Sequence, residues 1–270
     1  MKSKLAAAPY LVWMAVFTIV PLGLVFYYGL TDQDGNFSID NLSRMGMYTN
    51  IFFRSVWLAI VATVVCLIIA YPLAFILSRM ETRKQNTMLL LVMLPMWMNF
   101  LLRTYAWMTL LETNGVINKL LGLVGLGPFE MINTQGAIVL GMVYNYVPFM
   151  ILPLYSVMTK IDKSIIEAAQ DLGSNARQVL MKVIIPLSKP GIMTGITMVF
   201  VPSVSTFIIS RMLGGGSNML IGDLIEQQIL GTSYNLNLGA SISIVLMIFI
   251  FMIMAVMNQF DDEEMEGMII

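Results

Sequence analysis

Residues 162–192 read DKSIIEAAQDLGSNARQVLMKVIIPLSKPGI and form the longest polar, helix-patterned segment of the chain. The sequence on either side is almost entirely apolar. Of the 270 residues, 58% are hydrophobic and 11% are charged, and the mean hydropathy is +0.80. A soluble domain of this length carries roughly a quarter charged residues. The composition therefore predicts a membrane protein in which residues 162–192 form an amphipathic loop outside the bilayer.

Composition also excludes several classes of function. The chain has no histidine, which rules out Ser-His-Asp and Cys-His catalysis and histidine-ligated metals. The one cysteine, Cys66, provides neither an intrachain disulfide nor a cysteine metal cluster. No G-x-x-x-x-G-K-S/T phosphate loop occurs, and a net charge of -1 argues against a nucleic-acid partner. We therefore expect no catalytic residue, metal or cofactor in this chain.

Six apolar stretches are long enough to cross a bilayer, since a spanning helix needs about 20 apolar residues. They lie at residues 8–30, 54–78, 88–111, 137–158, 190–212 and 239–258. The first is longer than the ~7–15 apolar residues of a signal peptide, so we expect a retained span. A short helix is expected around residues 116–123, and the acidic tail 259–270 is expected to be solvated. The sequence predicts an all-α integral membrane protein with six transmembrane helices.

Lysine and arginine set the orientation, because cytoplasmic loops of membrane proteins carry an excess of both. With the N-terminus inside, the inner segments hold ten of the fifteen: Lys2, Lys4, Arg79, Arg83, Lys84, Lys160, Lys163, Arg177, Lys182 and Lys189. The outer loops hold only Arg44, Lys119 and Arg211, while Arg54 and Arg103 lie at or within spans. This distribution predicts that both termini and residues 162–192 face the cytoplasm.

The polar loop is predicted to form two short helices. Ser164 and Glu167 fit a capping box for the first, and Gly173 fits its C-terminal cap. Ser174 is placed to cap the second helix, and Pro186 is expected to stop or bend it. Apolar residues of the second helix recur with helical spacing at Ala176, Val179, Leu180, Val183 and Ile184. Two helices set at an angle by Gly173 would protrude from the membrane as a docking surface for a partner.

These residues match a known pattern. Glu167-Ala168-Ala169, Gly173 and Val183-Ile184-Ile185-Pro186, with three and nine residues between them, resemble the EAA signature of ABC importer permeases, although Val183 and Ile185 replace the usual Ile and Leu. The segments LLRTYAW at 101–107, PFMILPLY at 148–155 and LGGGSNMLIG at 213–222 look like the B-type permease of spermidine/putrescine importers. The resemblance covers residues 54–258, which we take as the permease core after an N-terminal span and external loop at 1–53.

The resemblance implies a type-I importer in the cytoplasmic membrane of a bacterium, built from two permeases, a cytoplasmic dimer of ATP-binding subunits and an extracytoplasmic binding protein. ATP and magnesium would be bound by the partner ATPase. The coupling loop, residues 160–189, would transmit closure of the ATPase dimer to the spans. Its contact and elbow would be Glu167, Ala168, Ala169 and Gly173, with Pro186 at the return to the membrane. Glu167 keeps a second role open, as the capping partner of Ser164.

A path for a polyamine should offer carboxylates, aromatic faces and amide oxygens, because this substrate is a flexible polycation. The candidates are Trp97, Asn99, Tyr105, Trp107, Glu112, Tyr144, Asn145, Tyr146, Asp223 and Glu226. Aromatic residues near span ends are also typical of the membrane interface. Arg103 would repel a polycation, and in an apolar stretch it should face the bundle interior or a partner subunit as a structural ion pair or gate.

Two other classes of function remain open. A secondary transporter driven by an ion gradient would need intramembrane acids or histidines, and the span centres contain almost none. A membrane-embedded enzyme would need a nucleophile and a base, and no cluster of this kind is evident. The same type of importer could also carry another small solute, because the polyamine assignment depends on the resemblance.

Overall fold

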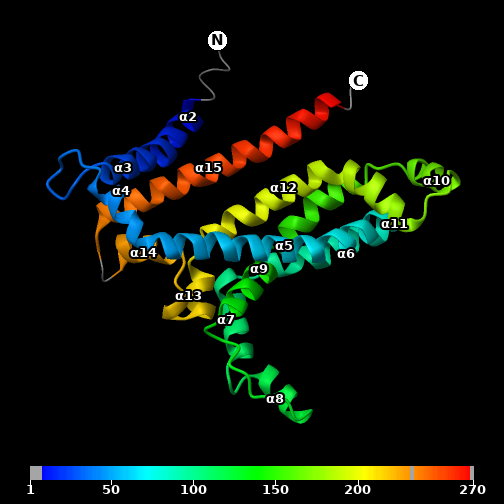
Figure 1. Cartoon of the computed structure of the whole chain (residues 1–270), viewed down its shortest axis with the longest axis horizontal. Coiled ribbons are helices and arrows are strands. Elements are labelled where there is room, and N and C mark those ends of the chain that lie inside the picture. Colours follow the sequence, from blue (N-terminus) through cyan, green and yellow to red (C-terminus); the bar gives the residue numbers. More distant parts are fainter. Residues whose placement is uncertain (1–7, 232–233, 268–270) are drawn as a thin grey trace.

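Helices make up nearly all of the protein (Figure 1), whose structure is a computed structural model describing residues 8–231 and 234–267. The elements are α2 (Ala8–Met14), η1 (Ala15–Ile19), α3 (Val20–Gly29), α4 (Asp40–Arg44), η2 (Met45–Tyr48), α5 (Thr49–Arg79), α6 (Thr82–Trp97), α7 (Phe100–Leu111), α8 (Val116–Leu123), α9 (Gln135–Met158), α10 (Lys163–Asp171), α11 (Ala176–Val179), η3 (Leu180–Ile184), α12 (Ile185–Val204), α13 (Ile208–Gly214), η4 (Gly216–Asn218), α14 (Ile221–Leu230) and α15 (Leu236–Gly267). In this part of the chain five helical segments are long and apolar enough to cross a membrane, and a bent pair supplies a sixth. The predicted all-α membrane fold is confirmed, with five or six candidate spans among the described residues.

The centre of the fold is a bundle of α5, α9 and α12, which pack against one another. Small side chains permit their close approach. On α5 the buried small residues follow one another at helical spacing: Ala59, Ala62, Cys66, Ala70 and Ala74, each 0% exposed. On α12, a Cβ atom at Gly195 would lie 2.6 Å from Met150 Sδ of α9. Since no space separates these faces, the three helices form one tightly packed unit.

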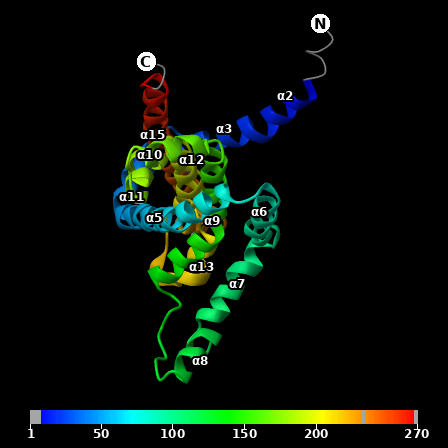
Figure 2. The same cartoon turned by 90° about the vertical axis from the view of Figure 1, so that its right-hand side faces the viewer.

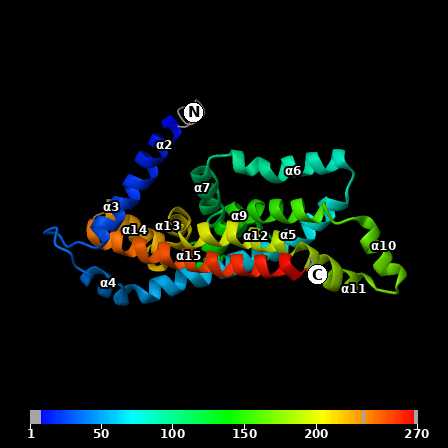
Figure 3. The same ribbon diagram turned by 90° about the horizontal axis from the view of Figure 1, so that it is seen from above.

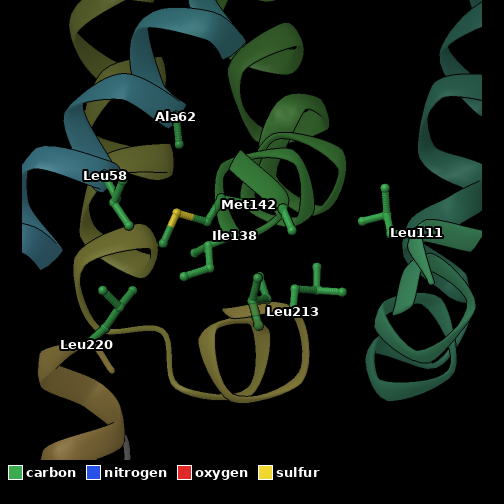
Figure 4. Packing of buried hydrophobic residues seen from close by; sticks show 9 residues of the cluster. Leu58, Ala62, Leu111, Ile138, Met142, Leu213 and Leu220 are labelled. Carbon is green, nitrogen blue, oxygen red and sulfur yellow. The ribbon is translucent and has the colours of Figure 1, made fainter. Parts of the chain in front are cut away.

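One apolar cluster attaches α7 and α13 to this bundle (Figure 4). Leu58 of α5, Met142 of α9 and Leu213 of α13 point toward one another in its middle, and Leu111 of α7 lies at its edge. All four side chains are at most 3% exposed. Burial of a leucine or methionine side chain stabilises a fold by about 1.5–3 kcal/mol in water, a gain that shrinks where the alternative neighbour is lipid. The cluster fixes α13 against α9, at some distance from the coupling loop.

The N-terminal span joins the bundle through α3, which packs against α15. Ser241 Oγ donates a hydrogen bond to the Gly29 carbonyl at 2.7 Å, and Asn237 Nδ2 donates to the Thr31 carbonyl at 2.8 Å. Beyond α3, the segment α2–η1 leaves the bundle at an angle (Figure 3), with Phe17 64% exposed. A segment this exposed and apolar is suited to contact with lipid or with another membrane subunit.

The stretch 88–111 was predicted as a single span, and this prediction is wrong in detail. The stretch breaks between α6 and α7, and the two parts enclose an angle of 86°. Asn99 explains the break, because its side-chain oxygen accepts hydrogen bonds from the backbone N–H groups of Leu101 at 2.8 Å and Leu102 at 3.3 Å. An asparagine in this role starts a new helix. Figure 2 shows α6, α7 and α8 as an arm beside the bundle.

The fifth stretch also differs from the prediction of 190–212. A continuous helix runs over Ala176–Val204, and α13 follows as a separate helix after a break. Pro186, which was expected to stop or bend this helix, does not stop it. The π-helical turn η3 precedes it, and the Ile185 N–H bonds to the Leu180 carbonyl. Such a wide turn accommodates the hydrogen bond that a proline cannot donate.

The remaining boundaries agree more closely. The fourth span is α9, and the short helix expected around 116–123 is α8. The second span, α5, begins at Thr49, five residues before the predicted start. Helix α15 continues from the sixth span to Gly267, so the predicted acidic tail begins as helix. Residues 268–270 of that tail lie outside the described residues, as do residues 1–7.

Candidate functional site

The candidate coupling loop begins with α10, which lies at one end of the long axis of the molecule, opposite α4 and α14 (Figure 1). Asp162 caps this helix by accepting a hydrogen bond from the Ser164 N–H at 3.0 Å. The same bond holds the pKa of the exposed Asp162 carboxyl below its usual value. The predicted capping box of Ser164 and Glu167 is therefore wrong, because the cap lies two residues earlier. Glu167 is exposed and makes no side-chain hydrogen bond or ion pair with the described residues.

Gly173 forms the elbow between the two helices, as predicted. Its φ angle is +84°, in the left-handed region that favours glycine. The Gly173 N–H donates to the Gln170 carbonyl at 2.8 Å, and the Ser174 N–H donates to the Ala169 carbonyl at 3.0 Å. These two bonds close the C-terminus of α10 and turn the chain toward α11. Ala168 beside Glu167 is exposed and Ala169 is half-buried.

The second helix is capped by Asn175 and not by Ser174 as predicted. The Asn175 side chain accepts from the Gln178 N–H at 2.9 Å, and the Gln178 side chain accepts from the Asn175 N–H at 2.9 Å. This reciprocal pair is a capping box shifted by one residue. Helix α11 then continues through η3 into α12, so the loop leads into the fifth span without a break in helical structure, although Figure 1 shows α11 and α12 running in different directions.

Three polar contacts, which sequence reasoning missed, fasten the spans next to the coupling loop. Arg79 at the end of α5 donates from Nη1 to the Ile161 carbonyl at 3.0 Å and from Nη2 to the Met158 carbonyl at 3.5 Å. Gln85 of α6 accepts from the Tyr155 hydroxyl of α9 at 2.9 Å. The hydroxyls of Tyr71 on α5 and Ser188 on α12 lie 2.9 Å apart. The only sequence signal for any of these contacts was the position of Arg79, a cation at the end of an apolar stretch.

Arg79 is the central contact of the three. Its guanidinium satisfies the carbonyl groups at the C-terminus of α9, where a positive charge is favourable. It also lies over the Phe75 ring, with Cζ 5.5 Å from the ring centroid. Through Ile161 the guanidinium holds the residue directly before Asp162, the cap of α10. Arg79 therefore links the end of α5 to the end of α9 and to the segment that leads into α10.

The predicted substrate-path residues do not converge on one site. Trp107 of α7 and Tyr144 of α9 meet edge to face, with ring centroids 5.4 Å apart. Asn145, which follows Tyr144 in the sequence, is buried. Trp97 and Tyr105 are 72% and 57% exposed, and Asn99 caps α7. Glu112 is exposed at the C-terminus of α7.

Arg103 is buried, with 8% of its surface exposed, as expected for a charged group in an apolar stretch. Its Nε and Nη1 atoms have no hydrogen-bond partner among the described residues. The guanidinium lies 6.0 Å from the centroid of the Phe100 ring and within electrostatic range of Tyr146. Asn145 Oδ1 is likewise buried without a partner in this part of the chain. Buried polar groups normally have a partner, and Arg79 Nε and Asp223 Oδ1 share this lack of one among the described residues.

The two acidic residues of α14 have structural contacts. Asp223, 3% exposed, accepts a hydrogen bond from the Leu220 N–H at 2.9 Å and so caps the helix. Burial raises the pKa of this carboxyl above its ordinary value. Glu226 forms an ion pair with Arg211 of α13, with Nη1 and Oε1 3.1 Å apart, and this partner raises the pKa of Arg211. No three His, Cys, Asp or Glu residues gather as a metal site in the described ranges.

Comparison with known proteins identifies the family to which these features correspond. Residues 20–260 match the family model of the binding-protein-dependent transport system inner membrane component. The chain is 35% identical over 237 residues to the spermidine/putrescine transport system permease protein PotB of Haemophilus influenzae, covering 84% of this chain and 83% of the relative. A bacterial ABC transporter involved in the import of the acidic polysaccharide alginate shares the fold, with a TM-score of 0.77, 15% identity, and 97% and 96% of the two chains covered. The alginate transporter bound to a periplasmic protein that carries an alginate pentasaccharide gives a TM-score of 0.74 at 15% identity, with 95% and 92% covered.

Proposed function

Because the chain belongs to the family of binding-protein-dependent transport system inner membrane components, we propose that it is a permease subunit of an ATP-driven polyamine importer. The observation that carries the substrate class is the 35% identity, over 84% of the chain, to a spermidine/putrescine permease. The substrate would be delivered by an extracytoplasmic binding protein and released into the cytoplasm by alternating access. This chain would supply part of the path and no catalytic group, while ATP and magnesium would be bound by the partner ATPase.

We place both termini and the coupling loop in the cytoplasm. The distribution of lysine and arginine supports this orientation, since ten of fifteen lie on that side. A cytoplasmic dimer of ATP-binding subunits would receive α10, on which Glu167 and Ala168 are exposed. The arm α6–α8 supports a sister permease as the other membrane partner, because apolar side chains such as Leu102, 66% exposed, are uncovered there.

Energy would pass from the ATPase through the elbow at Gly173 into the bundle. Helix α11 is continuous with α12, so a displacement of the loop rotates or tilts that span directly. Arg79 would carry the same displacement to α5 and α9 through the Ile161 and Met158 carbonyls. Because the three helices pack without intervening space, they would move as one body. The unpaired guanidinium of Arg103 is suited to a gate, with its partner on the sister permease.

The substrate path itself would run along α7 and α9. Trp107 and Tyr144 offer aromatic faces to a polycation, and the free Oδ1 atom of Asn145 offers a hydrogen-bond acceptor. Trp97, Asn99, Tyr105 and Glu112 would join them only if the sister permease encloses the arm. Asp223 and Glu226 would then act at the outer entrance, where their present contacts hold α14 in place.

Reconstitution tests this function. The chain, its ATPase, its sister permease and its binding protein are incorporated in liposomes, and ATP-dependent uptake of labelled spermidine, putrescine and an unrelated amino acid is measured. We expect uptake of at least one polyamine and none of the amino acid. An ATPase whose phosphate-loop lysine is replaced by alanine serves as the inactive control. Uptake of a different solute alone would retain the importer and reject the substrate, whereas polyamine accumulation without ATP would reject the coupling.

A further inference from the structure

An apolar groove of about 560 Å³ lies between the coupling loop and the end of α5. One wall consists of Tyr71, Phe75 and Ile76 of α5, and the other includes Ile166 of α10 and Val179 of α11. Helix α10 packs chiefly on α11 and stands away from α5, which leaves this space. Glu167, the proposed ATPase contact, is not part of the lining. The groove therefore lies on the side of the coupling loop that faces α5, and it does not include Glu167.

The groove is continuous with the side of α5 that is open to lipid. Ile69 and Ile76 are 46% and 53% exposed, and together with Pro72 they follow one another at helical spacing along this side. Pro72 and Ile76 also belong to the groove lining. An apolar chain in the bilayer can therefore enter the groove along α5 without crossing a polar barrier.

Positive charge borders the groove. The Arg79 guanidinium lies over the ring of Phe75, a lining residue, at 5.5 Å. Each Nη atom has two N–H groups, so Arg79 retains a donor on both after its bonds to Ile161 and Met158. Arg177, Glu167 and Asp171 are exposed and follow the lining residues Ala176, Ile166 and Gln170 in the chain, so Arg79, which contacts Phe75, is the charge placed at the groove itself. Basic pockets beside membrane helices on the cytoplasmic side are suited to anionic lipid headgroups.

We propose that this groove binds one acyl chain of an anionic phospholipid from the inner leaflet, with the phosphate at Arg79 and Arg177. The inference depends on the cytoplasmic orientation of the loop proposed above. The bound chain fills the space between α10 and α5 and supports α10 in its extended position. Lipid composition then affects how firmly the coupling loop is held against the bundle, a form of regulation separate from ATP and substrate.

Photolabelling tests the site in the assembled importer, held in nanodiscs. A phosphatidylglycerol and a phosphatidylcholine, each with a diazirine in the acyl chain, are the probes, and labelled peptides are identified by mass spectrometry. We expect phosphatidylglycerol to label peptides containing residues 71–76 and 176–184 several-fold more than phosphatidylcholine does. Ala176→Trp fills the groove and should abolish this labelling, whereas Ala255→Trp, at an exposed position of α15, should leave it unchanged.

A surface variant separates the headgroup from the acyl chain. Arg177→Gln should lower the preference for the anionic lipid about fivefold, because one basic side chain near an anionic surface contributes a factor of this size. Equal labelling by both lipids, or labelling spread over all exposed faces of α5 and α15, would overturn the proposal. Labelling of the ATPase in place of the groove would show that protein covers it, with the same consequence. Labelling does not require transport, so this result and the uptake assay can fail independently.

Discussion

Substitutions at Gly173 test the backbone conformation of the elbow separately from its side-chain packing. A Cβ atom added there meets nothing within 4 Å, so a side chain causes no clash. The cost arises from the φ angle of +84°, which an ordinary residue adopts at about 1–2 kcal/mol. Asparagine tolerates this region far better than alanine or valine does. Three variants, Gly173→Ala, Gly173→Val and Gly173→Asn, therefore differ in backbone preference while the surroundings stay the same.

The energy sets the expected size of the effect. A penalty of about 1–2 kcal/mol lowers the population of this elbow about 5–30-fold relative to other shapes of the loop. If the ATPase recognises only this shape, uptake per ATP hydrolysed falls in Gly173→Ala and further in Gly173→Val, and it largely returns in Gly173→Asn. Membrane insertion should be the same in all three, because the elbow lies outside the spans.

The assay measures two rates in one proteoliposome preparation, ATP hydrolysis and polyamine uptake. Their ratio reports coupling and does not depend on the amount of assembled complex. The substitution Gly46→Ala is the matched control, since Gly46 also has open space around its Cβ position but lies far from the coupling loop. An alanine variant at the elbow with a normal ratio would refute the reasoning, and so would an asparagine variant as impaired as the valine one.

Other positions give further predictions. Arg79→Gln should reduce uptake more than ATP hydrolysis. The loss of a charged hydrogen bond costs about 1.5–3 kcal/mol, and the lower figure is expected at this half-buried site. Normal coupling in this variant would contradict the proposed transmission. Gly195→Leu should destabilise the bundle by about 1–3 kcal/mol, seen as a lower Tm of the purified complex, because its Cβ would lie 2.6 Å from Met150 Sδ; Gly23→Leu, in open space, should leave the Tm unchanged. For Asp223, a pKa raised above the ordinary value of 3.8 means that its contribution to stability is complete below pH 3.8 and is lost as pH rises through the raised pKa. Asp223→Asn should flatten this part of the Tm–pH curve, and an unchanged slope would assign it to another group.

The parts of the fold that depend on local pattern could be predicted from the sequence. Long apolar runs located the spans, and α8 was found at its observed residues. Gly173 was identified as the elbow because few residues other than glycine adopt a positive φ angle. Both predictions depend only on residues that are close in the sequence, within one or two helical turns.

The wrong predictions concern positions where two neighbouring residues can play the same structural role. Asp162 and Ser164 can both cap α10, as Ser174 and Asn175 can both cap α11, and the structure uses the alternative in each pair. Of the two outcomes predicted for Pro186, a stop or a bend, the stop is excluded, because the π-helical turn before it keeps the helix continuous.

Contacts between distant residues could not be read from the sequence. Arg79 bonds to Ile161, 82 positions away, and Tyr71 contacts Ser188, 117 positions away. Asp223 was predicted as a candidate for the substrate path, and its helix is folded against the bundle and buries the carboxyl. In the proposed importer, the residues of α7 and α9 that line the path would also depend on the sister permease. Both the coupling loop and the substrate path stay predictions.

The close packing along α5 also has a geometric consequence. At 1.5 Å per residue, the 31 residues of α5 extend about 46 Å. A rigid rod of this length that tilts by about 5° at the Arg79 end moves its other end by about 4 Å, which is close to the width of an extended carbon chain. In the proposed importer, the stiffness that alanines and glycines give to the helix contacts would convert a small rotation at the ATPase into a displacement large enough to open or close a passage for a slender cation.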